Sequence, residues 1–314
     1  MSLVERGPGL VPEPVVEEPV APRSALQGLA ARARSARGRW WRGNARLGLA
    51  LVVPVALYAV VVPWIADPAA TRIDPARRFA PPGFWLVDGS QPFFGTDHLG
   101  RDLAVTTALG LRTSILIGLG AVVLSALIGW VFGAVTGFLG GRVDSFGSRV
   151  MDLFNAFPGL LLVIGLMTAL GSSPRNAVLV LALATWVVFG RVARSQALAL
   201  RGAPFIDGAR LSGVTLPGIV AGHVRRNTFP LVGALCVIEL PRLILAEATL
   251  SFLGFGIQPP TFSLGRVVAE ERDYLQLEPW AATFPGVLLA LFCVGVALLG
   301  MGLRADLSRG VRDR

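Results

Sequence analysis

Residues 112–139 read RTSILIGLGAVVLSALIGWVFGAVTGFL, and Arg112 is the only ionisable residue in this stretch. A helix rises about 1.5 Å per residue, so about 20 apolar residues cross the hydrocarbon core of a bilayer, which is about 30 Å thick. The stretch is therefore long enough to span a membrane. Gly129, Gly133 and Gly137 form two overlapping GxxxG patterns in it, which predict close packing against another helix of the same subunit.

Apolar runs of comparable length recur along the chain. They occupy residues 47–66, 150–171, 176–195, 230–252 and 281–303. Such runs are too long for the buried core helices of a soluble domain. The sequence therefore predicts an all-α fold, namely a polytopic membrane protein with about six transmembrane helices.

The composition of the whole chain agrees with this prediction. The 314 residues are 53% hydrophobic and 16% charged, whereas a soluble domain carries about 25% charged residues. All 29 basic residues are arginine, and the net charge is +9. The arginines lie at the edges of the apolar runs and form no stripe interleaved with aromatic residues. We therefore expect them to set the orientation of the chain in the membrane, and we expect no binding of nucleic acid.

The distribution of arginine predicts which segments face the cytoplasm, because positive charge is enriched on that side. With six spans, four segments share one side: the N-terminal tail with its eight arginines, the loops 140–149 and 196–229, and the C-terminal tail. We expect this side to be cytoplasmic. Two long segments, 67–111 and 253–280, then lie outside the cell.

Four parts follow from this topology. Residues 1–45, rich in Pro, Glu and Ala at their start, are expected to form a largely disordered cytoplasmic tail. Residues 46–111 hold the first transmembrane helix and an external loop. Residues 112–308 form the core, whose cytoplasmic loop lies near 196–229, and residues 309–314 form a second cytoplasmic tail.

The sequence offers little that an enzyme would need. The chain contains no lysine and therefore no GxxxxGK[ST] loop for nucleotide phosphates. Its only histidines, His98 and His223, are expected on opposite sides of the membrane, where they cannot share a metal ion. We expect no catalytic residue, no metal site and no cofactor bound by this chain.

Three ionisable residues fall within the run 230–252, where such residues are candidates for function. Glu239 and Arg242 are three residues apart and can pair on one face of a helix. They either line a polar translocation path or neutralise each other inside the bundle, and the spacing leaves both readings open. Glu247 lies nearer the outer end of the run, where water can reach it.

The loop 196–229 contains the signals of a short helix. Pro204 suits the first helical turn, Asp207 suits the positive end of the helix dipole, and Gly213 suits a left-handed cap. Phe205 and Ala209 share a face. Such a helix can dock in a groove of a soluble partner, although an ordinary surface helix has the same pattern.

The same residues carry a family resemblance. Asp207-Gly208-Ala209 followed by Gly213 resembles the "EAA…G" loop of bacterial ABC importer permeases. Residues 94–102, FGTDHLGRD, and residues 247–260, EATLSFLGFGIQPP, are similar to signatures of the dipeptide, oligopeptide and nickel permeases, closest to the C-type subunit. The resemblance covers about residues 45–308. Asp207-Gly208 stands where the family usually has Glu-Ala.

The resemblance implies a five-helix permease core behind one peripheral helix, in the plasma membrane of a bacterium. It implies transport of a peptide-like solute together with a B-type permease, two ATPase subunits that bind ATP and magnesium, and an external solute-binding protein. The expected ATPase-coupling helix comprises Phe205, Asp207, Gly208, Ala209, Arg210 and Gly213. The expected external signature, which holds the shape of its loop, comprises Gly95, Asp97, Gly100, Arg101 and Asp102.

Two other functions compete with this one. An ion-coupled secondary transporter would use intramembrane carboxylates and often shows inverted repeats, but the candidates here are Glu239 and Glu247 and no repeat is evident. A scaffold or receptor subunit would carry no solute.

Overall fold

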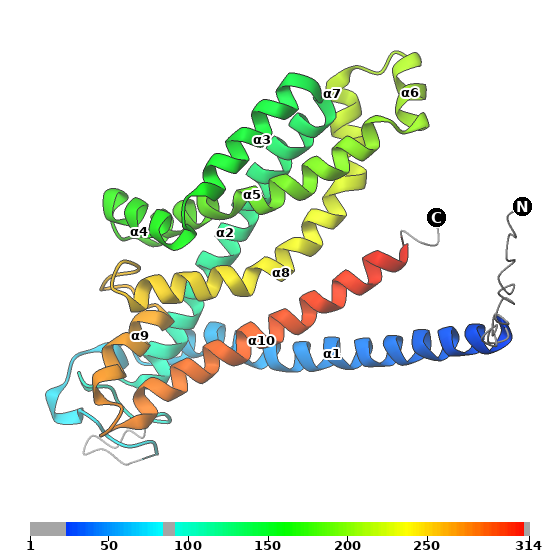
Figure 1. Ribbon diagram of the computed structural model, residues 1–314. Helices are drawn as coiled ribbons and strands as arrows, with labels where there is room; N and C mark the ends of the chain where they lie inside the picture. Colours follow the sequence, from blue (N-terminus) through cyan, green and yellow to red (C-terminus); the bar gives the residue numbers. More distant parts are fainter. Residues whose placement is uncertain (1–22, 84–91, 311–314) are drawn as a thin grey trace, which may run out of the picture. The chain divides into compact units, whose positions relative to one another are not determined.

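The computed structural model describes residues 23–83 and 92–310, and these residues are mostly helical and contain no strand (Figure 1). The chain divides into two compact units, Met1–Arg42 and Gly43–Arg314, and every span lies in the second. Five helices in the described residues are long and apolar enough to cross a membrane, or six if one bent pair counts as a span. The predicted all-α membrane fold is thereby confirmed.

The first helix, α1, runs from Arg23 to Ile65, and its apolar part is Asn44–Ile65. It therefore begins within the segment 1–45, which the sequence analysis expected to be largely disordered. No proline occurs between Arg23 and Val53, and alanine, leucine and arginine, which favour helices, are frequent there. Residues 1–22 lie outside the described part of the chain.

The longest apolar helix, α2, covers Leu103–Leu139 and begins nine residues before the predicted run. Asp102 caps it, since its side chain accepts hydrogen bonds from the backbone N–H groups of Ala104 and Val105. Gly140 ends the helix with a φ of 66°. This early start places the first turns of α2 in contact with the loop that precedes it.

The predicted span 150–171 is not one straight helix. The chain forms α3, Gly141–Ala156, and α4, Gly159–Leu170, which meet at an angle of 84°. Pro158 explains the break, because the residue before a proline is pushed out of the helical region, and Phe157 has a ψ of 134°. The apolar run extends across this bend, so hydropathy alone could not reveal it.

The remaining spans are α5, Pro174–Arg201, a continuous stretch Leu216–Phe252, and α10, Pro279–Gly310. The stretch is made of α7, Leu216–Ile219, a π-helical turn, Val220–Val224, and α8, Arg225–Phe252.

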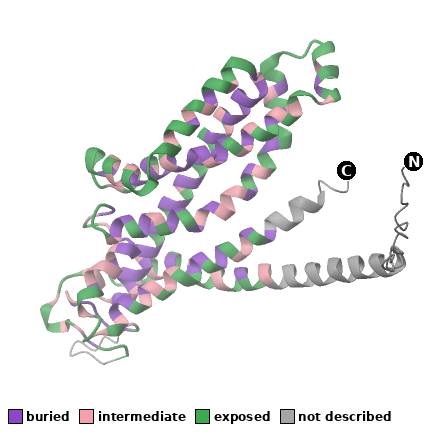
Figure 2. Ribbon diagram, in the orientation of Figure 1, coloured by how far each residue is buried: buried purple, intermediate pink, exposed green. Residues whose placement is uncertain are grey.

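Helices α2 and α5 pack closely along the glycines that the sequence singled out. A methyl group at Gly133 would lie 2.1 Å from the carbonyl oxygen of Gly190, and one at Gly137 would lie 2.5 Å from that of Arg194. Figure 2 shows the buried residues gathered along α2 and α5. The predicted close packing within the subunit is confirmed.

The two ends of this bundle carry different short elements (Figure 1). At one end lies α6, Pro204–Leu211, between α5 and α7. At the other lies α9, Leu264–Glu271, followed by the 3₁₀ turn Arg272–Tyr274. Two further 3₁₀ turns, Pro68–Thr71 and Pro75–Arg77, precede α2 at this end. We call these the α6 end and the α9 end.

Candidate functional site

Helix α6 forms where the sequence predicted a short helix. Pro204 occupies its first turn, together with Asp207. Gly213 follows with a φ of 78°, and its N–H donates to the carbonyl of Arg210. The left-handed glycine and the acidic first turn are the features expected of a capped helix of this length.

The side chain that fixes α6 to the bundle is Ile206, which the sequence analysis did not name. Ile206 is 0% exposed and packs with Phe138 of α2, Ala197 of α5 and Val224 of the π-helical turn before α8. The guanidinium of Arg210 lies 5.7 Å from the ring centroid of Phe138. Ile206 and Arg210 are four residues apart, so this spacing was the available signal for the face that contacts the bundle.

The opposite face of α6 is open. Phe205 is 48% exposed and Leu211 is 91% exposed, and Val214 and Leu216 continue the apolar surface. Asp207 and Arg210 form an exposed ion pair of 3.3 Å. Exposed apolar side chains gathered beside a rigid helix are typical of a surface that binds another protein. The sequence predicted that Phe205 and Ala209 share one face, but it did not single out Leu211, which is the most exposed of these apolar side chains.

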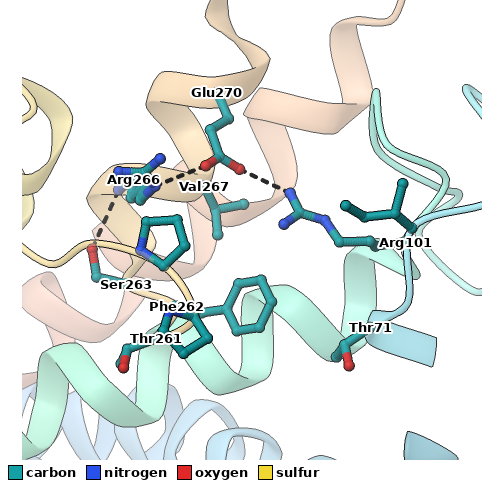
Figure 3. Close-up of a pocket in the computed structure, with 11 residues that line it drawn as sticks. Thr71, Arg101, Thr261, Phe262, Ser263, Arg266, Val267 and Glu270 are labelled. Atoms are coloured by element: carbon teal, nitrogen blue, oxygen red, sulfur yellow. Dashed lines mark hydrogen bonds and ion pairs between the residues drawn. The ribbon is translucent and has the colours of Figure 1, made fainter. Parts of the chain in front are cut away.

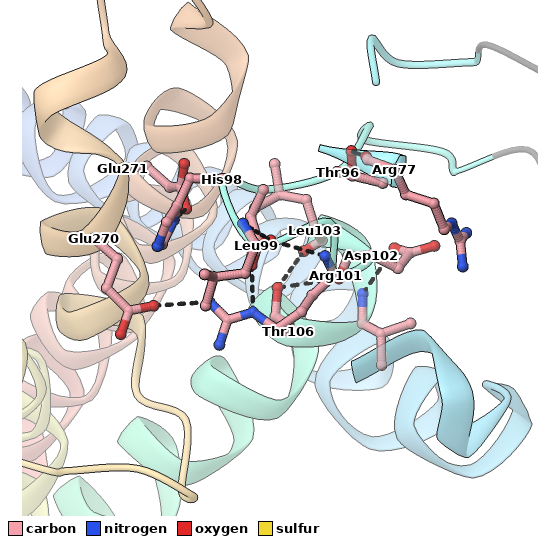
Figure 4. A network of polar contacts seen from close by, with 12 residues as sticks. Arg77, Thr96, His98, Leu99, Arg101, Asp102, Leu103, Thr106, Glu270 and Glu271 are labelled. Atoms are coloured by element: carbon pink, nitrogen blue, oxygen red, sulfur yellow. Dashed lines mark hydrogen bonds and ion pairs between the residues drawn. The ribbon is translucent and has the colours of Figure 1, made fainter. Parts of the chain in front are cut away.

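At the α9 end, the loop before α2 is tied to α9 by a chain of ion pairs (Figure 4). Arg101 donates from Nε to Asp97, over 2.5 Å, and from Nη2 to Glu270, over 2.8 Å. Arg266 also donates to Glu270, over 2.8 Å. Asp97 is buried and accepts two further bonds from the N–H groups of Leu99 and Arg101. The loop before α2 is thereby joined to α9, which follows α8 in the chain.

The other signature residues shape the same loop. Gly95 and Gly100 have φ values of 81° and 78°, in the region that favours glycine. A methyl group at Gly100 would lie 1.9 Å from the carbonyl oxygen of Asp74. Asp102 caps α2, and burial raises the pKa of its carboxyl although the capping N–H groups act the other way. These contacts hold the conformation of the loop.

His98 joins the network through Glu271. Its Nδ1 lies 2.6 Å from Oε1 of Glu271, which is buried, and its ring stacks on Tyr274. The hydrogen bond to Glu271 raises the pKa of His98, and the charges of Asp97 and Glu270 add to this effect. Burial alone would raise the pKa of Glu270, but the bonds from Arg101 and Arg266 hold it below its usual value.

A pocket of about 290 Å³ lies between the two segments that this network joins (Figure 3). Thr71, Ile73 and Arg101 line it from the loop before α2. The turn after α8 and the start of α9 contribute Pro259 to Ser263, Arg266, Val267 and Glu270. The pocket combines apolar walls with two guanidinium groups and one carboxylate, which suits a small amphipathic side chain or solute group.

On α8, Glu239 and Arg242 form the predicted pair. Glu239 Oε2 lies 3.2 Å from Arg242 Nη1. The two side chains differ in burial, because that of Glu239 is 11% exposed and that of Arg242 is 63% exposed. A charged side chain facing lipid at the centre of a span costs about 3 kcal/mol, so we expect Arg242 to face water or protein.

The expectation that Glu247 is hydrated was wrong. Glu247 is 1% exposed and accepts a 2.7 Å hydrogen bond from the hydroxyl of Ser251. The hydroxyls of Ser114 and Ser263 also face it. Ser114 in turn accepts from the N–H of Leu264, the first residue of α9. Since the turn after α8 folds back over it, Glu247 lies where α2, α8 and α9 meet.

The chain also resembles known proteins along most of its length. The family model described as "Binding-protein-dependent transport system inner membrane component" matches residues 129–313. The chain belongs to this family. Its matched region includes α6 and the whole of α8, α9 and α10.

Relatives of this family member carry names from peptide transport. A Brucella suis protein described as a peptide transport system permease is 38% identical over 271 residues, which are 86% of this chain and 89% of that protein. The oligopeptide transport system permease protein OppC of Escherichia coli K12 is 34% identical over 88% of this chain and 90% of its own. The dipeptide permease DppC of Alkalihalophilus pseudofirmus is 31% identical over 83% and 84%.

Family membership decides between the functions left open by the sequence. A multi-pass component of a binding-protein-dependent system is a transport subunit, and the ion-coupled secondary transporter receives no support.

Proposed function

We propose that this chain is the C-type permease subunit of an ATP-binding-cassette importer that carries dipeptides or oligopeptides across a bacterial plasma membrane. Two separate ATPase subunits supply the energy by binding ATP with magnesium, and a B-type permease completes the path. The names of its relatives support the solute class. The observation that carries the proposal is α6, which is anchored by Ile206 and offers Phe205 and Leu211 to a partner.

The distribution of arginine supports an orientation for the two ends. The α6 end faces the cytoplasm together with both termini, where the ATPases act. The α9 end faces outward, and its pocket and loops receive the solute-binding protein. Because Arg101 and Glu270 join the two outward segments, a partner that binds one of them also acts on the other. Glu239 and Arg242 lie on the path of the solute between these ends.

Reconstitution tests this function against its two rivals. The chain is assembled with its B-type permease in proteoliposomes, with the solute-binding protein outside and with or without the ATPases inside. The proposal predicts peptide uptake that needs both ATP and the ATPases and that vanadate inhibits. Uptake driven by a proton or sodium gradient without ATPases would identify a secondary transporter, and no uptake under any condition would identify a scaffold.

A further inference from the structure

One face of α8 is exposed from the middle of the helix to its α9 end. Arg242, Leu245, Thr249 and Leu253 are exposed and follow each other at three- or four-residue intervals, so they lie on one side of the helix. From Arg242 to Leu253 this row is about 16 Å long. Within this row, Arg242 is the charged side chain, and the other three side chains are uncharged.

Most N–H donors of the Arg242 guanidinium are not used by the contact found for it. A guanidinium carries five N–H donors in a planar fork, and the contact found for Arg242 in the described part of the chain is the ion pair with Glu239. Glu239 is buried, and the ion pair with Arg242 is the one polar contact found for its Oε2 among the described residues. The pair therefore leaves most of the fork free on the exposed side, while the buried carboxylate holds the arginine and offsets part of its charge.

We infer that Arg242 receives the C-terminal carboxylate of the peptide during its passage, an inference that rests on the proposed function. A guanidinium and a carboxylate match each other in two parallel hydrogen bonds. Glu239 competes for the same guanidinium, so the carboxylate is held weakly enough to leave again, as a transport path requires. Arg242 thus contributes to solute selection inside the membrane, beyond the selection made by the solute-binding protein.

The test compares two solutes in the complete transporter. Proteoliposomes take up trialanine or trialanine C-terminal amide, each at a concentration that saturates the solute-binding protein, and the ratio of the two ATP-dependent rates is measured. The binding protein is the same throughout, so a change of this ratio in a variant belongs to the permease. We expect Arg242→Gln to lower the preference for the free acid about tenfold, the size of one charge-assisted hydrogen bond.

Two further variants keep the test decisive. Arg242→Lys keeps the charge and is expected to retain part of the preference, whereas Glu239→Gln frees the guanidinium and is expected to lower the KM for the free acid alone. Equal effects of all three variants on both peptides would overturn the inference. Loss of the B-type permease from the Arg242→Gln complex would also overturn it, since Arg242 would then serve the subunit interface. A wild-type complex that imports neither peptide would contradict the proposed function itself.

Discussion

At the scale of single residues, the network of the α9 end depends on buried and half-buried charges that satisfy one another. Asp97 is buried against Arg101, and that arginine also binds Glu270. Removing one partner of such a pair is costly because it strands the other charge, whereas replacing both by apolar groups is often neutral. The ion pairs of Arg101 with Asp97 and Glu270 therefore specify how the loop packs on α9.

Arg101→Met leaves Asp97 buried without its cation, and we expect it to lower the free energy of unfolding by about 3 kcal/mol. The matched control is Arg272→Met, which breaks the exposed pair between Arg272 and Asp273 and is expected to change stability by less than about 0.5 kcal/mol. Thermal unfolding of the purified complexes measures both. Adding Asp97→Asn to Arg101→Met should restore much of the loss, and its failure to do so would show that packing of Arg101 matters more than its charge.

His98 gives this end of the molecule a dependence on pH. Its pKa is raised above 6.5 in the folded state by Glu271, so the protonated form stabilises the fold. This stabilisation is fully present below pH 6.5 and is lost as the pH rises through the raised pKa. We expect the melting temperature of the wild type to exceed that of His98→Gln at low pH, and the difference to shrink as the pH rises through this window. A difference that stays constant with pH would contradict this account.

At the scale of elements, α6 packs one face on the bundle and leaves the other face exposed. Ile206→Ala removes a fully buried side chain, so we expect a loss of about 2–5 kcal/mol in stability. Leu211→Ala is the matched control on the open face and should leave the melting temperature unchanged. If both variants melted at the wild-type temperature, Ile206 would not anchor the helix.

Alanine substitutions at two glycines are expected to change the stability in opposite directions, because one glycine lies in the contact of α2 with α5 and the other meets no neighbour. Gly133→Ala places a methyl group against the carbonyl of Gly190, and such overpacking costs about 1–3 kcal/mol. Gly165→Ala on α4 meets no atom within 4 Å and is expected to stabilise its helix by up to about 1 kcal/mol. Unfolding in denaturant compares the two, and equal effects would contradict the packing described here.

Some elements could be predicted from the sequence and others could not. Local chemistry fixes the α6 helix, because a proline, an acidic first turn and a glycine act within one short segment. Apolar length predicts the spans, but it contains no information on direction, so the bend at Pro158 was missed. Ile206 and Glu247 were missed or misjudged for a related reason: their burial depends on helices distant in sequence that pack over them.

At the scale of the whole molecule, two ends with different chemistry are joined by continuous helices. Helix α2 begins at the capped, ion-paired loop of the α9 end and reaches Phe138, which lies beneath α6. The continuous stretch Leu216–Phe252 connects the Ile206 cluster, through Ile219 and Val224, to the buried Glu247. A helix that packs against α6 therefore extends to the loop beside the pocket at the other end.

The central claim is that energy enters this chain through the open face of α6. The most direct measurement combines Phe205→Ala, Asp207→Asn and Leu211→Ala in one chain and determines ATPase attachment and ATP-dependent peptide uptake in proteoliposomes. The account predicts that both are lost while the melting temperature of the permease pair stays that of the wild type. A triple variant that still binds the ATPases and imports peptide at the wild-type rate would contradict it.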